Sequence, residues 1–260
     1  MQAEAQIAKT TLDYDALMDL VLRIGFELID SGAETYRVEE SLLRILSCYG
    51  LKEIDIFAVA NYLLVSFVNP DGKTFSRGKR ILARHENLNR LGKLNQLSRE
   101  ICLETPEISD ARQQLEEIAQ LTGYSLIVRL FAAAVVGFAF CLMFGGSIQA
   151  GALAGAASVI VRLSIEPQIR LHVNGIFINI FGGAIGALLS LWIMQLGWST
   201  EMDRIMIGIY MNLVPGLALT NSLRDIIAGD YLSGLTKLTE ALLIASAIAI
   251  GSGMVFSLMR

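Results

Sequence analysis

The sequence is poor in the residues on which metal centres and acid–base catalysis usually depend. It contains two histidines, His85 and His172, and three cysteines, Cys48, Cys102 and Cys141, with no CxxC spacing. A zinc site, a His-containing triad and a disulfide scaffold all need more of these residues, or closer spacing between them. We therefore expect inert thiols, no metal ion and no other cofactor.

Charged residues are also scarce, but only in one half of the chain. Charged side chains make up 18% of the 260 residues, against about 25% in an average soluble protein. Residues 1–126 carry 33 of them and residues 127–260 carry 13. The net charge of −4 argues against a basic nucleic-acid-binding protein. The contrast predicts two domains, at residues 1–125 and 126–260.

The second half contains apolar runs close to the length of about 20 residues that crosses a bilayer as a helix. Five such segments are predicted, at residues 127–145, 148–163, 173–196, 205–220 and 235–258. Small residues recur at four-residue spacing, as in Gly151/Gly155 and Gly182/Gly186, which predicts close packing of helix backbones. This half is therefore predicted to be a five-helix transmembrane module.

The first half has the patterns of a soluble domain. Apolar residues at helical spacing predict a helix over 13–30, and Ser31 with Glu34 fits a capping box that starts a second helix over about 34–49. Strands are expected at 53–60, 62–69 and 73–77, and further helices at 86–104 and 109–121. The order ααβββαα predicts a small α+β domain. The expected fold class is thus an α-helical integral membrane protein whose transmembrane module follows a small cytoplasmic α+β domain.

Basic residues predict the orientation in the membrane. The first residues hold no apolar run of the kind found in a signal peptide. Arg129 lies near the start of the first segment, Arg162 and Arg170 lie at and beyond the end of the second, and Arg224 lies between the fourth and fifth. The protein is expected in the cell membrane, that is, the inner or plasma membrane. Because basic residues favour the cytoplasmic side, the N-terminus is expected in the cytoplasm and the C-terminal Arg260 on the outer side.

Two groups of charged residues in the first half have two interpretations each. One interpretation is a solvated surface with helix caps and ordinary pairs; the other is contact with an anionic lipid or substrate, or another local function. The basic group comprises Lys73, Arg77, Lys79, Arg80 and Arg84, and the mixed group comprises Asp30, Glu34, Arg37, Glu39 and Glu40.

The fourth apolar segment carries the strongest local signal for a binding site. Pro215 has no N–H to donate to the carbonyl of Met211, and Gly216 adds backbone freedom. In a membrane, protein, water or solute must satisfy such a carbonyl. A break beside Asn212 therefore predicts either a polar-solute site or a structural kink. Further candidate binding residues are Asn179, Asn221 and Arg224.

Carboxylates near the apolar segments are candidates for proton coupling. Glu240 lies three residues after Lys237, so the two can pair on one helix face, either at an interface or as part of ion coupling. Asp225 follows the helix break. Glu240 and Asp225 are the proton-coupling candidates, because burial raises the pKa of a carboxyl group.

Two stretches resemble the threonine/serine exporter family. They are DSGAETYRVEESLLRI at 30–45 and LVPGLALTNSLRDIIAGDYLSGLTKLTEALL at 213–243, and the resemblance extends over nearly the whole chain. It implies export of threonine and serine driven by the proton gradient, or of a dicarboxylate such as succinate. It also implies that the chain is the long component of a split, two-protein form that works with a second small membrane subunit.

The protein is therefore expected to be a component of a secondary exporter for small polar metabolites. It is expected to form a homo- or hetero-oligomer and to contact membrane lipid. No catalytic residue is expected. One alternative is a regulatory or scaffold subunit whose partner carries the substrate. Another is a membrane-anchored enzyme, but the sequence has no GxSxG, HExxH or P-loop motif.

Overall fold

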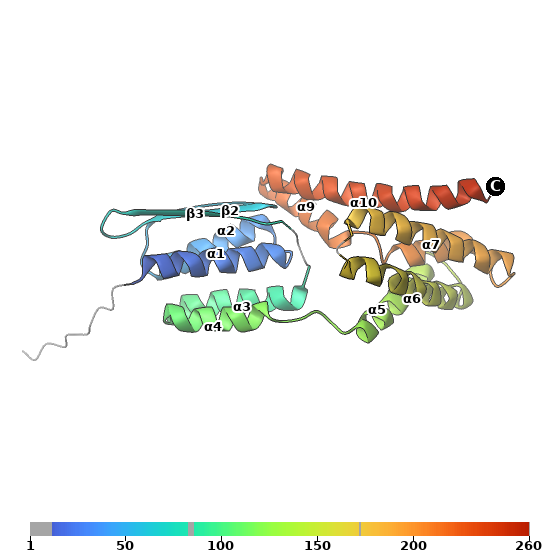
Figure 1. Cartoon of the computed structure of the whole chain (residues 1–260), viewed down its shortest axis with the longest axis horizontal. Coiled ribbons are helices and arrows are strands. Elements are labelled where there is room, and N and C mark those ends of the chain that lie inside the picture. Colours follow the sequence, from blue (N-terminus) through green and yellow to red (C-terminus); the bar gives the residue numbers. More distant parts are fainter. Residues whose placement is uncertain (1–11, 83–85, 172, 260) are drawn as a thin grey trace, which may run out of the picture. The chain divides into compact units, whose positions relative to one another are not determined.

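The structure is a computed structural model that describes residues 12–82, 86–171 and 173–259. Arg84, His85, His172, Arg260 and the first residues, which entered the predictions above, lie outside the described residues. The chain divides into two compact units (Figure 1). The N-terminal unit comprises residues up to Thr122 together with Asn221–Thr236, and the apolar unit comprises Gly123–Thr220 and Lys237–Arg260.

The N-terminal unit has the predicted order of helices and strands. The sheet is an antiparallel meander in the order β1-β2-β3, in which Glu53 pairs with Val68 and Tyr62 with Arg80. The elements are α1 (Tyr14–Asp30), α2 (Thr35–Cys48), β1 (Glu53–Val59), β2 (Tyr62–Val68), β3 (Thr74–Arg80), α3 (Leu88–Glu104) and α4 (Ile108–Ala119). Each agrees with its sequence-predicted range to within a few residues.

Three layers make up this unit: the sheet, the pair α1 and α2, and the pair α3 and α4 (Figure 1). Each layer contributes fully buried apolar side chains, among them Ile24 of α1, Leu42 of α2, Leu63 of β2 and Leu94 of α3. Burying one such side chain contributes about 1.5–3 kcal/mol. The periodic apolar residues of the sequence therefore form one core.

The turns between these elements depend on residues that accept unusual backbone angles. A tight turn joins β2 to β3: Gly72 donates its N–H to the carbonyl of Asn69 at 2.9 Å and has a φ of +80°. Gly50, just past α2, has a φ of +83°. Thr105, the C-cap of α3, also has a positive φ, +41°, although a β-branched residue rarely adopts this conformation. The hairpin and the end of α2 therefore lie within a few residues of the ranges predicted from the sequence.

The capping box predicted for Ser31 and Glu34 is wrong. Ser31 is the C-cap of α1, and α2 begins only at Thr35. Glu34 is the N-cap residue of α2, but its side chain makes no capping hydrogen bond. The reason is that α1 extends to Asp30, so that Ser31 still belongs to the end of the preceding helix.

The apolar unit is built from helices. Four of them are long and apolar enough to cross a membrane: α5 (Leu126–Met143), α6 (Ile148–Arg170), α7 (Gly175–Gln195) and α10 (Tyr231–Leu258). The predicted fourth segment, 205–220, is instead divided between α8 (Met202–Tyr210) and α9 (Gly216–Ala228). Among the described residues, the structure thus has four candidate spans and one broken segment in place of five continuous helices.

The second predicted segment is longer than expected. The sequence analysis ends this segment at residue 163, but α6 continues through Pro167 and contains Arg162, Glu166 and Arg170. Glu166 pairs with Arg162 and with Arg170, each four residues away on the same helix face. The pair with Arg170 spans Pro167, where the helix lacks one backbone hydrogen bond, but such a pair offsets only a small part of the cost of a proline inside a helix.

The two units do not follow the single boundary expected near residue 125. The first change of unit falls between Thr122 and Gly123, close to that boundary. The chain then returns, because Asn221–Thr236 belongs to the N-terminal unit. Most of α9 and the first residues of α10 are therefore part of the N-terminal unit.

Glycines allow close approach of helices within the apolar unit, as their spacing predicts. A Cβ at Gly155 of α6 would lie 2.8 Å from the carbonyl oxygen of Ala134 in α5. A Cβ at Gly183 of α7 would lie 2.5 Å from the carbonyl oxygen of Ile248 in α10. Because backbone atoms cannot rotate away, a side chain at either position would push two helices apart.

We predict that Gly155→Leu destabilises the apolar unit by about 1–3 kcal/mol, the usual cost of overpacking. Gly253→Leu in α10 is the matched control, because no atom lies within 4 Å of its added Cβ. Thermal unfolding of both variants in the same detergent measures the difference. Equal unfolding temperatures for the two variants would contradict the packing described here.

Candidate functional site

The predicted helix break is present in the apolar unit. Helix α8 ends at Tyr210, and α9 begins at Gly216, directly after Pro215. Between them the backbone forms tight turns, in which Leu213 and Val214 both donate their N–H groups to the carbonyl of Tyr210, at 2.8 and 3.0 Å. Pro215 cannot continue α8 because it has no N–H to donate.

Asn212 lies in this break, beside the middle of a long helix. Its side-chain amide donates to the hydroxyl oxygen of Ser158 at 3.1 Å. Ser158 is 1% exposed and lies near the middle of the 23-residue α6. The break therefore places polar backbone and side-chain groups halfway along a candidate membrane span.

A second polar contact adjoins the break on the other side of α8. The hydroxyl of Tyr210 donates to the carbonyl of Gly183 in α7 at 3.2 Å and lies 2.7 Å from the hydroxyl of Ser252 in α10. The sequence analysis did not single out Tyr210 or Ser252. The signal available was that Tyr210 lies two residues before Asn212, at the end of the apolar run that starts at Ile205.

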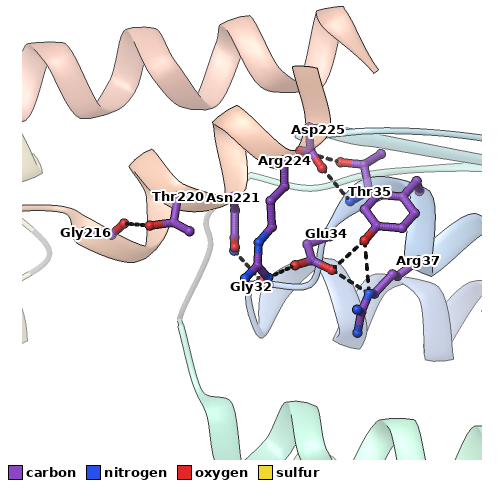
Figure 2. A network of polar contacts seen from close by, with 10 residues as sticks. Gly32, Glu34, Thr35, Arg37, Gly216, Thr220, Asn221, Arg224 and Asp225 are labelled. Carbon is purple, nitrogen blue, oxygen red and sulfur yellow. Dashed lines mark hydrogen bonds and ion pairs between the residues drawn. The ribbon is translucent and has the colours of Figure 1, made fainter. Parts of the chain in front are cut away.

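A different network joins the two sequence stretches at 30–45 and 213–243, within the N-terminal unit (Figure 2). Asp225 of α9 accepts a hydrogen bond from the backbone N–H of Thr35 at 3.2 Å, and its other oxygen lies 3.3 Å from the Thr35 hydroxyl. That hydroxyl is also 2.9 Å from the hydroxyl of Ser233. Asp225 is fully buried. Because it accepts the N–H of Thr35, the first residue of α2, it caps the N-terminus of that helix.

Glu34 makes the adjacent ionic contacts. Its carboxylate pairs with Arg224 of α9 and, at 2.6 Å, with Arg37 of α2, and its side chain is 8% exposed. Asn221 donates its amide to the carbonyl of Gly32 at 3.1 Å. Burial alone would raise the pKa of Glu34, but the hydrogen bond from Arg224 and the charge of Arg37 keep that pKa below its ordinary value.

Glu39 has the opposite electrostatic environment. Burial raises the pKa of this carboxyl group, and the negative charges of Asp230 and Asp55 add to the effect. It accepts a hydrogen bond from the backbone N–H of Ala58 at 2.7 Å, which partly offsets the increase. Glu34 and Glu39, five residues apart in one motif, therefore differ in the direction of their pKa shifts.

Comparison with known proteins identifies the family. A family model described as "Putative threonine/serine exporter" matches residues 19–259. The chain belongs to the threonine/serine exporter family.

Two curated relatives agree with this assignment. The chain is 21% identical over 238 residues to a Mycobacterium tuberculosis protein named "Probable threonine/serine exporter", covering 90% of this chain and 45% of the relative. It is 24% identical over 246 residues to the "Threonine/serine exporter" of Corynebacterium glutamicum, covering 92% and 50%. The chain thus spans about half the length of these relatives. No solved structure matches it.

In this member of the threonine/serine exporter family, the predicted site residues divide between the two units. Asn221, Arg224 and Asp225 come together with the first motif in the N-terminal unit. Asn212 and Pro215 lie at the helix break of the apolar unit.

The two remaining candidates lie on long helices of the apolar unit. Asn179 donates its amide to the carbonyl of Gly175 in its own helix at 2.8 Å. Glu240 is exposed on α10, whereas Lys237, its predicted partner, is 4% exposed. The roles assigned to these residues from the sequence remain predictions.

We predict that Glu34→Gln lowers the stability of the protein at neutral pH by about 1 kcal/mol, because it removes the ionic contacts to Arg224 and Arg37. A carboxyl group with a lowered pKa contributes stability above its unfolded-state pKa and loses it as the pH falls through its folded-state pKa. The difference from wild type should therefore disappear in acid.

Thermal unfolding of the whole chain across a pH series measures this effect. Glu40→Gln is the matched control, because Glu40 lies on the same helix in an exposed pair with Arg44. A destabilisation of Glu34→Gln that is the same at all pH values would argue against an ionic origin.

Proposed function

We propose that the protein is a component of a membrane exporter for small polar metabolites, with threonine and serine as the first candidates. The observation that carries this proposal is the break between α8 and α9, in a chain of the threonine/serine exporter family. Asn212 of this break contacts Ser158, near the middle of α6. A broken helix at mid-depth offers polar groups to a solute where the surroundings are otherwise apolar.

The groups at the break fit the two ends of an amino acid. The amide of Asn212 is a hydrogen-bond donor for a carboxylate, in exchange for its contact with Ser158. Backbone carbonyls of the turn residues 211–213 are acceptors for an ammonium group. A dicarboxylate such as succinate has no ammonium group and would use only the hydrogen-bond donor at the break. The backbone carbonyls are therefore proposed to favour amino acids over dicarboxylates.

We further propose coupling to protons. Glu240 is the better of the two candidates, because it lies exposed on α10 in the apolar unit. Asp225 is buried and engaged in capping α2, which gives it a structural task. The proposed orientation has the N-terminus in the cytoplasm and the C-terminus outside, because Arg129, Arg162 and Arg170 gather at one end of α5 and α6.

A second membrane subunit is part of the proposal. The matched relatives are about twice as long as the region they share with this chain. The proposed partner subunit would correspond to the half of these relatives that this chain does not match. The alternative is that this chain is a regulatory or scaffold subunit. Efflux by the partner alone would favour that alternative, whereas efflux that needs both proteins would favour the exporter.

We predict that Asn212→Ala lowers threonine efflux at least tenfold, because it removes the amide at the break; one charge-assisted hydrogen bond of about 1.5–3 kcal/mol corresponds to this change. Efflux from vesicles that contain the chain and its partner, with serine, threonine and succinate as solutes, measures it. Ser190→Ala is the control, because this buried hydroxyl is satisfied by Gly186 of its own helix. Unchanged efflux in Asn212→Ala would refute the assigned site.

We predict that Glu240→Gln removes the dependence of efflux on an imposed pH gradient. Asp225→Asn should keep that dependence but lower the unfolding temperature, because the loss of a helix cap costs about 0.5–2 kcal/mol. The same vesicles, with and without a pH gradient, provide the measurement. The opposite result for the two variants would move the coupling role to Asp225.

A further inference from the structure

Four charged side chains meet at one end of α5 and α6, away from the helix break. Arg129 forms a two-pronged contact with Glu166, with nitrogen–oxygen distances of 2.8 and 3.1 Å. Arg162 and Arg170 approach the same carboxylate at 3.4 and 3.6 Å. The side chain of Glu166 is 8% exposed. One buried carboxylate thus holds three guanidinium groups together.

The charges of this cluster do not balance. Three arginines and one glutamate leave two positive charges within helices that are candidate membrane spans. In addition, the Nε atoms of Arg129 and Arg162 are buried and have no hydrogen-bond partner among the described residues. Buried donors without a partner are rare in proteins, and excess charge is costly in an apolar environment. Both features indicate that an anion binds here.

The surface around the cluster indicates what carries that anion. Large apolar side chains on the same helices are exposed close to it in sequence, among them Ile127 and Phe131 on α5 and Leu163 on α6. In a membrane such residues contact acyl chains. A ligand that combines an anionic group with acyl chains satisfies the arginines and the apolar surface together.

We infer that Arg129, Arg162 and Arg170 bind the phosphate group of an anionic phospholipid, and that Glu166 positions the three guanidinium groups. Arginine forms strong, directional hydrogen bonds with phosphate oxygens. An anionic headgroup is favoured over a zwitterionic one, because the cluster has a net positive charge that a choline group would not compensate.

The test measures lipid retention by the full chain. The protein is transferred to nanodiscs that contain phosphatidylglycerol and phosphatidylcholine, released, and examined by native mass spectrometry. Wild type should retain phosphatidylglycerol in preference to phosphatidylcholine. Arg162→Gln should weaken this retention about tenfold, and Arg170→Gln, whose side chain is more exposed, about threefold. Glu166→Gln should also weaken it, although it adds one net positive charge, because it removes the carboxylate that positions the three guanidinium groups.

Arg204→Gln is the matched control, because Arg204 belongs to the same unit and pairs one-to-one with Glu201; its retention should equal that of wild type. Thermal unfolding with inorganic phosphate or threonine in place of lipid separates the sources of the anion. Protection by either of these without lipid, or equal retention by wild type and Arg162→Gln, would overturn the inference. Circular dichroism of each variant reports whether it has folded.

Discussion

The first turn of α2 needs an acceptor for its free N–H groups, and the structure supplies one from far along the chain. The carboxylate of Asp225 binds the N–H of Thr35, across a separation of 190 residues. A negative group at a helix N-terminus is favourable both as a hydrogen-bond acceptor and through the helix dipole. Glu34 and Arg224 add an ion pair beside it. The two motifs that carry the family resemblance are therefore the two sides of one contact.

The apolar unit is governed by a different constraint, the missing N–H of Pro215. It ends α8 after nine residues and leaves Asn212 beside Ser158. Glycines at 155 and 183 bring the surrounding helices to backbone contact. Dense packing of helix backbones and a polar interruption therefore occur together in this unit.

Features that depend on neighbouring residues could be predicted from the sequence. The helical periodicity of 13–30, the turn at Asn69 and the break at Pro215 are all local, and all are present. Features that depend on distant residues could not. The cap of α2 comes from Asp225, and Glu166, beside the internal Pro167 of α6, pairs with Arg129 of another helix. Likewise, no pattern indicates that Asn221–Thr236 packs with the N-terminal unit.

The long-range cap also has a consequence for the order in which the protein matures. The ribosome makes the chain from its N-terminus, so α1 to α4 emerge well before Asp225 exists. The helices α5 to α8 must be synthesised in between. Until then the first turn of α2 lacks its acceptor. Completion of the N-terminal unit is thus delayed until most of the apolar helices have been produced, and a fragment that stops before α9 would never reach its finished form.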